Sequence, residues 1–164
     1  MTTNAFYEWL DTEYFPWKYT AAHRLKTTRT SLHHHCDTPE EWEQLARAHT
    51  ALFQMDVQDI RTCLKTTDEG IHGLGIAGAS GLLALLYPAY FGTVDKFVLL
   101  ALWSVPNPGL PEPLPDPDKA ISLTIGTGLI YLFRRKAEEL NRRFQTIEWT
   151  PRKIDMVLWG IRNN

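Results

Sequence analysis

The stretch that decides the fold is IHGLGIAGASGLLALL, residues 71–86. Gly73 and Gly75 alternate with hydrophobic residues, and an apolar run rich in small residues continues until Pro88 ends it. Two glycines allow a tight turn, so backbone N–H groups of the turn and of the next helix can point outward and bind a phosphate. The same pattern fits a glycine-rich helix connection packed in a core, and the stretch alone does not separate the two.

The small residues of this run predict a close contact between elements. Gly78, Ala79 and Gly81 fall in the first turns of a helix expected over about 77–87. Because these turns carry no bulky side chains, another element can approach the helix backbone closely.

Helical spacing of apolar residues extends over the rest of the chain, and convincing period-2 strands are missing. We therefore predict an all-α fold, a compact multi-helix domain covering residues 1–164. The clearest helix start is at Thr38, which caps, with Pro39 in the first helical position and Glu41 completing a capping box. Further helices are expected at about 56–64, 94–104, 118–146 and from Pro151, the last one capped by Thr150.

Composition restricts the classes of function. Nineteen acidic residues against seventeen Lys and Arg give a formal charge of -2, so a nucleic-acid site has to be a local patch. The two cysteines, Cys36 and Cys63, are too few for a disulfide scaffold, a four-cysteine zinc site or an iron–sulfur cluster. The first residues carry acidic groups and lack the pattern of a secretion signal. We expect a cytoplasmic protein without metal or cofactor.

Six of the ten prolines lie between 105 and 117. Their alternation favours an extended, stiff connector. Because residues 118–164 are too few to bury a core alone, we predict a strap across one domain at 105–117, which offers a surface for a protein partner.

Residues 70–94 contain no Asp, Glu, Lys or Arg and are long enough on paper to cross a bilayer. They also contain six glycines, Pro88 and His72, and no run of Lys or Arg flanks them. This composition argues against a membrane span.

Two other motifs are weak. Residues 73–78 match the dinucleotide-binding pattern G-x-G-x-x-G, but the preceding 56–69 has helical periodicity where that fingerprint needs a strand. His33, His34 and His35 precede Cys36, yet adjacent residues on one short segment cannot easily all turn toward one metal ion.

The order of glycine turn, small-residue helix, Tyr87-Pro88 and Gly92 loop, and then Asp95 resembles the core of the helix-hairpin-helix DNA glycosylase superfamily. The resemblance is best over residues 67–102, and residues 150–159 look like the closing helix of small members. It implies a helix-hairpin-helix motif within the all-α domain, double-stranded DNA as the partner, and a DNA-associated protein.

The resemblance also implies roles for single residues. Gly73 and Gly75 match the hairpin glycines, so they and the amides of Ile76 and Ala77 are the expected phosphate contacts. Asp95 matches the catalytic aspartate. Ala77 stands where lyase-type members carry a Schiff-base lysine, which implies a monofunctional enzyme without strand cleavage. The usual hairpin proline is His72 here, and the iron–sulfur cysteines of some members are absent.

The chemistry of such an enzyme is consistent with these residues. A carboxylate at Asp95 can stabilise the positive charge that develops on the sugar, or activate water. The base has to be flipped out of the stack into an aromatic pocket, for which Trp17 and Tyr19 are candidates. Core packing is the alternative for these rings and their neighbours Trp9, Tyr14 and Phe15.

A cationic stretch adds candidate DNA contacts. Between Trp17 and Cys36 there are four basic and no acidic residues: Lys18, Arg24, Lys26 and Arg29. They could form a phosphate-facing strip or an ordinary solvated helix face.

Two readings of the function therefore stand beside each other. The first is a monofunctional DNA N-glycosylase that excises a damaged or modified base with Asp95. The second is a non-catalytic DNA-binding or protein-interaction module that keeps the fold, which the small size and Ala77 favour.

Overall fold

The computed structural model describes residues 1–105 and 114–161, and every regular element within these ranges is helical, as predicted. The elements are α1 (Thr3–Trp9), the π-helix η1 (Leu10–Tyr14), α2 (Phe15–Lys18), α3 (Ala22–His34), α4 (Pro39–Leu52), α5 (Ile60–Gly70), α6 (Gly75–Leu86), α7 (Lys96–Trp103), α8 (Leu123–Phe144) and α9 (Pro151–Ile161).

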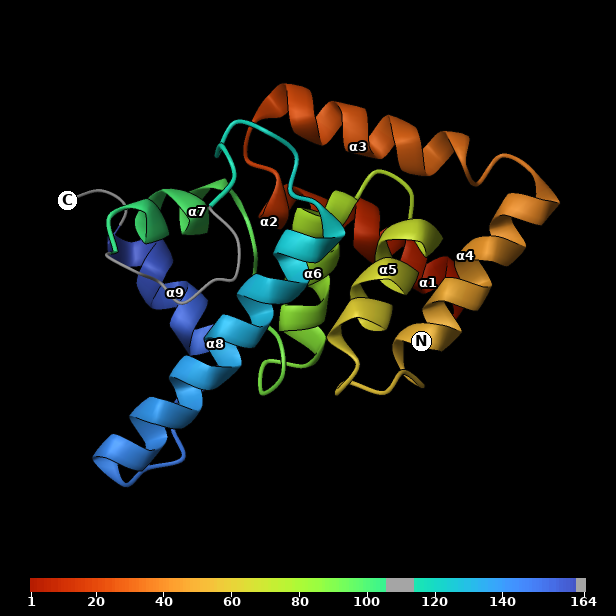
Figure 1. Cartoon of the computed structure of the whole chain (residues 1–164). Coiled ribbons are helices and arrows are strands. Elements are labelled where there is room, and N and C mark those ends of the chain that lie inside the picture. The colour runs from red at the N-terminus through yellow and green to blue at the C-terminus, as the bar shows by residue number, and fades with distance from the viewer. Residues whose placement is uncertain (106–113, 162–164) are drawn as a thin grey trace.

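Helix α6 lies at the centre of the molecule, between α5 and α8, and α3 crosses one end of the assembly (Figure 1). Helices α7 and α9 pack together on the side opposite α4. One cluster of buried hydrophobic side chains runs from Phe6 in α1 to Ile154 in α9, so the two ends of the described chain share a core.

The predicted helix starts at Thr38 and Thr150 are confirmed. The Thr38 hydroxyl oxygen accepts from the Glu41 backbone N–H (3.3 Å), and the same hydroxyl donates to the Glu41 carboxylate (2.8 Å). Thr150 accepts from the backbone N–H of Lys153 at 3.3 Å. Both caps satisfy backbone donors that a helix N-terminus leaves without a partner.

Two helices begin later than predicted because a cap further along the chain is used. The helix expected from about residue 56 begins at Ile60, where Asp59 accepts from the Thr62 backbone N–H at 3.0 Å. The helix expected from about residue 118 begins at Leu123, with Ser122 as its cap.

The predicted close approach to α6 is confirmed. The hydroxyl of Tyr14 donates to the backbone oxygen of Gly78 (2.5 Å), and that of Tyr19 donates to the oxygen of Leu74 (2.7 Å). A Cβ added at Gly78 would collide with the Tyr19 hydroxyl, and one at Gly81 would lie 2.8 Å from the Tyr14 hydroxyl. The glycines of α6 therefore allow the N-terminal segment to pack against this helix.

The connection between α5 and α6 is a sharp turn, at which the pair of helices bends by 112°. Gly73 has φ +89° and Gly75 has φ +62°, a backbone region that favours glycine. Gly73 packs against α3, since a Cβ there would lie 3.0 Å from the backbone oxygen of Thr28. The two glycines thus form the tight turn that their spacing predicted.

Within the described ranges, no single helix is long and apolar enough to cross a membrane, although α5 and α6 meet the length and composition test when taken together as a bent pair.

The predicted strap at 105–117 lies largely outside the described residues, since 106–113 are not among them. Its C-terminal end, residues 114–117, is described. The backbone oxygen of Pro115 accepts from Trp103 Nε1 at 3.3 Å, and Leu114 packs against the hydrophobic core.

Candidate active site

Asp95 lines a cleft with a volume of about 410 Å³. Three aromatic side chains from different elements form its walls: Trp17 from α2, Phe97 from α7 and Trp159 from α9. They are 46%, 39% and 47% exposed. Trp17 is thus the one predicted pocket residue that borders this cleft.

The carboxylate of Asp95 is held from two sides. Its Oδ1 accepts from the backbone N–H groups of Phe97 (3.0 Å) and Val98 (3.1 Å), which makes Asp95 the N-cap of α7. Its Oδ2 lies 3.3 Å from Nζ of Lys18. A helix N-terminus favours a negative charge at this position. The side chain keeps 17% of its surface exposed and so stays within reach of the cleft.

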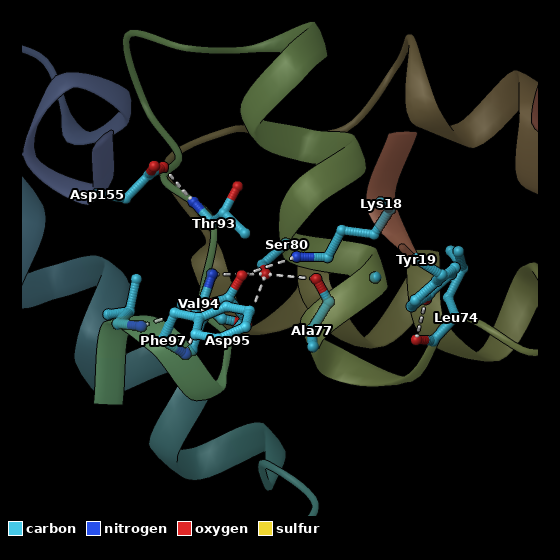
Figure 2. A network of polar contacts seen from close by, with 12 residues as sticks. Lys18, Tyr19, Leu74, Ala77, Ser80, Thr93, Val94, Asp95, Phe97 and Asp155 are labelled. Atoms are coloured by element: carbon cyan, nitrogen blue, oxygen red, sulfur yellow. Dashed lines mark hydrogen bonds and ion pairs between the residues drawn. The ribbon is translucent and has the colours of Figure 1, made fainter. Parts of the chain in front are cut away.

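Lys18 is a buried cation inside the site. Its side chain is 7% exposed, and its stem packs over Gly81, where a Cβ would lie 3.2 Å from Cδ of Lys18. Burial lowers the pKa of the Lys18 ammonium, and the Asp95 carboxylate acts in the opposite direction. Figure 2 shows Lys18 reaching toward Asp95 while its neighbour Tyr19 points away toward Leu74.

A second pair of charges lies across the cleft. Asp155 is only 2% exposed; its Oδ2 accepts from the Thr93 backbone N–H, and its Oδ1 accepts from Nη1 of Arg152. Burial raises the pKa of the Asp155 carboxyl, although the bonds from Arg152 and Thr93 act against that rise. The Arg152 guanidinium also lies over the Trp17 ring, 5.8 Å from its centroid. A charged network therefore joins α9 to the loop before α7 and to α2.

Gly92 permits α9 to dock against this loop. A Cβ at Gly92 would lie 2.6 Å from the backbone oxygen of Pro151 and 3.0 Å from Oδ2 of Asp155. A side chain at this position would separate Asp155 from the loop that it binds.

Ser80 couples Asp95 to the glycine turn. Its buried hydroxyl oxygen accepts from the backbone N–H of Val94 at 2.9 Å and lies 3.1 Å from the backbone oxygen of Ala77, to which it donates (Figure 2). The residue before Asp95 is thereby fixed to the first turns of α6.

Tyr19 has a different place from the one predicted. It is 8% exposed, packs under the glycine turn and does not border the cleft. Burial raises the pKa of its phenol to about 12, while the nearby Arg24 acts to lower it. The bond to the Leu74 oxygen and the fit against Gly78 explain why this ring turns inward.

The four predicted phosphate contacts do not form one strip. Lys18 is buried against Asp95, and Arg29 donates to the backbone oxygen of Asp11 (2.7 Å) and pairs with its carboxylate (3.1 Å). Arg24 and Lys26 are exposed on α3. Lys18 and Arg29, two of the four cations, therefore already pair with a carboxylate or carbonyl group of the protein.

The glycine turn presents its amides unevenly. The first backbone bond of α6 runs from the Gly78 N–H to the Leu74 oxygen (3.3 Å), so the N–H groups of residues 75–77 precede the helical ladder. Gly75 is exposed, Ala77 half-buried and Ile76 buried. The Gly75 N–H faces the carboxylate of Asp68 and lowers its pKa, against a larger rise that comes from burial.

His72, which replaces the proline usual in the similar family, stacks on His35 with ring centroids 3.2 Å apart. Its Nε2 lies 3.2 Å from Nε2 of Gln44. Burial and the neighbouring His35 lower the pKa of His72. Among the described residues, no group of three or more His, Cys, Asp or Glu is arranged to hold a metal ion.

Sequence reasoning missed the roles of Lys18, Ser80, Thr93, Arg152 and Asp155. A weak local indication existed for Lys18, which follows the buried Tyr14 by four residues. Arg152 and Asp155 are three residues apart at the start of a helix, and this spacing indicates a pair on one helix face. It does not indicate that the pair binds Thr93.

No known protein-family model matches this chain, and neither curated proteins nor solved structures show a match to it.

Proposed function

We propose that this protein is a monofunctional DNA N-glycosylase that flips a damaged or modified base into the cleft and hydrolyses its bond to deoxyribose. The observation that carries the proposal is the position of Asp95, a fixed carboxylate at the edge of an aromatic-walled cleft of about 410 Å³. Small-molecule sites usually have volumes of about 300–1,000 Å³ and combine apolar walls with a few placed polar groups.

Hydrolysis of an N-glycosidic bond develops positive charge on the sugar. Because two backbone N–H groups and Lys18 hold Asp95 in place, its carboxylate can oppose that charge without reorganising. Its Oδ2, on the Lys18 side, is the oxygen that would accept a proton from the attacking water. Lys18 is then a positioning residue, because it acts through Asp95.

The glycine turn supports contact with the DNA backbone. Its N–H groups at residues 75–77 precede the helical ladder, and Arg24 and Lys26 are exposed on the adjacent α3. Ser80 connects this turn to the loop that carries Asp95. A phosphate at the turn would thus be held in register with a base in the cleft.

Two contacts favour the second candidate, a non-catalytic DNA-binding or protein-interaction module. Each oxygen of Asp95 already has a partner, Lys18 on one side and the α7 amides on the other. Asp68 places a carboxylate where the first candidate needs a phosphate. Both contacts are also what a purely structural network would contain.

Equilibrium binding separates the candidates. Affinity is measured over a salt series for duplexes with and without an abasic-site analogue, because a flipping enzyme prefers a site whose base is already removed. Preference for the analogue, together with excision from a panel of modified bases, supports the glycosylase. Equal weak binding to both duplexes favours the module. No binding at low salt contradicts the glycosylase and a DNA-binding module, and leaves a module that binds a protein partner at the proline-rich strap as the function to test.

A further inference from the structure

In the cleft, the carboxylate oxygens already have hydrogen-bond partners, whereas some N–H donors have none among the described residues. This difference indicates the class of ligand. Asp155 has a partner on each carboxylate oxygen, and so has Asp95. Nζ of Lys18 carries three hydrogens, of which one reaches Asp95. The cleft therefore has donors to offer a ligand, whereas each of its four carboxylate oxygens already accepts at least one hydrogen bond.

Arg152 is the most specific of these donors. Its Nη1 donates to Asp155 and, at 3.1 Å, to the hydroxyl oxygen of Thr93. Within the described parts of the chain, Nε and Nη2 of Arg152 make no hydrogen bond. The Nε–Nη2 edge is a planar fork that matches two adjacent acceptors, and the contacts of Nη1 and of the Trp17 ring fix its plane.

Charge and shape restrict what this fork can bind. The two carboxylates of the cleft, Asp95 and Asp155, offset its two cations, Lys18 and Arg152, so the site has no net attraction for a phosphate. The aromatic walls favour a flat ring. A flat ring with two adjacent acceptors on one edge describes the O6 and N7 edge of guanine, which arginine binds through two hydrogen bonds.

We propose that the cleft selects a guanine-type base, read through its O6 and N7 atoms by the Nε–Nη2 edge of Arg152. Adenine places an amino donor beside N7 and meets a second donor at the fork, and cytosine also presents an amino group. Uracil has carbonyls, but an N–H separates them, so the fork reaches only one. This specificity rests on the proposed glycosylase function for the claim that the base comes from DNA.

The test uses free bases and needs no excision. The tryptophan fluorescence of the protein, to which Trp17 and Trp159 of the cleft contribute, is titrated with 9-methylguanine, 7-deaza-9-methylguanine, 9-methyladenine, 1-methylcytosine and 1-methyluracil. We expect 9-methylguanine to bind roughly 10-fold or more tightly than the others, including the deaza analogue, which lacks the N7 acceptor. Equal affinities for all five, or no binding of 9-methylguanine, would overturn the proposal.

Variants connect the selectivity to the fork. Arg152→Lys keeps a cation beside Asp155 but removes the planar edge, and should bring the affinity for 9-methylguanine down to that for 9-methyladenine. Because Arg152→Met alone would leave Asp155 buried without a cation, it is paired with Asp155→Asn in a double variant that should show the same loss. Lys153→Gln is the control, since Lys153 pairs with Glu148 on the surface. Selectivity that survives in the Lys variant and in the double variant contradicts the proposal.

A competition arm separates this inference from the proposed function. Displacement of a duplex with an unpaired guanine by 9-methylguanine supports both. Selective binding of the free base without any displacement of DNA supports the recognition of guanine and overturns DNA as its source. Excision of another base by a protein that does not select 9-methylguanine keeps the glycosylase and overturns the recognition.

Discussion

Nζ of Lys18 lies 3.3 Å from Oδ2 of Asp95, and this contact joins two residues 77 positions apart in the sequence. It brings a buried lysine to a carboxylate that also caps a helix. The pair determines what each substitution at Asp95 or Lys18 will reveal, because capping, charge pairing and the proposed catalytic role meet in one side chain.

Asp95→Asn separates these roles. Asparagine caps nearly as well as aspartate, a loss of about 0.5 kcal/mol or less. Lys18 loses its carboxylate partner as well, and bonds to charged groups are worth about 1.5–3 kcal/mol, so we expect a total loss of about 2 kcal/mol in urea unfolding. Excision should fall roughly 10²-fold or more while DNA binding persists.

The matched control is Asp59→Asn. Asp59 caps α5 in the same way but lies outside the cleft. It should leave excision unchanged. If the Asp95 variant excises as well as the parent, Asp95 is a cap only and the enzymatic proposal loses its main residue.

Gly75→Ala tests the glycine turn. The added Cβ meets open space, with the nearest atom Nη2 of Arg24 at 3.9 Å, so the cost comes from the φ of +62° and should be about 1 kcal/mol. If the turn amides bind a phosphate, affinity for DNA should fall by more than this loss of stability explains. Gly160→Ala, in α9 with nothing near its Cβ, is the control and should not weaken DNA binding. Equal losses of binding and stability at Gly75 would indicate a purely structural turn.

Borohydride trapping tests the absence of covalent catalysis. Ala77 stands in the lysine position, and Lys18, the lysine that lines the cleft, is paired with Asp95. We expect no protein–DNA adduct, and strand breaks only after alkali or heat. Lys96, the nearest lysine in sequence, pairs with Asp118 on the surface instead. A trapped adduct that Lys18→Arg abolishes would show that the enzyme is a lyase and contradict the monofunctional reading.

Because the pKa of His72 is lowered in the fold, we expect the protein to lose stability in acid. The folded pKa of His72 lies below the unfolded value, so below about pH 6.5 the unfolded chain binds a proton that the folded chain excludes. The contribution of neutral His72 to the free energy of unfolding is therefore fully present above that pH. It is lost as the pH drops through the lowered pKa. In urea unfolding at pH 7 and pH 5, His72→Gln should lose less stability than the parent. The exposed His23→Gln is the control, and a parent-like loss in the His72 variant would contradict the argument.

Local patterns predicted the local features of this fold. Thr38 and Thr150 cap as expected, and the small residues of α6 receive the two tyrosine hydroxyls. The glycine spacing predicted a tight turn, and both of its glycines have positive φ. The caps and the glycine turn depend on residues within one or two turns of each other, which is the range over which sequence periodicity is informative. The two tyrosines that approach α6 come from 64 and 55 positions away and were not predicted.

The composition of the cleft could not be predicted in the same way. Lys18 stands in a stretch without acidic residues, so it looked like a surface cation; its partner Asp95 comes from another part of the chain. Tyr19 and Trp17 are separated by one residue, and only the packing of Tyr19 against Gly78 decides which ring turns inward. Such choices depend on contacts between elements and not on spacing within one.

The docking of α9 at Gly92 has a consequence for the order of events during synthesis. Arg152 and Asp155 complete a cleft whose other wall, Trp17, leaves the ribosome long before them. A nascent chain that ends before Pro151 contains the glycine turn and Asp95 but lacks the guanidinium over Trp17 and the acid that binds Thr93. Because folding proceeds from the N-terminus during translation, the cleft beside Asp95 is complete only after α9 has emerged.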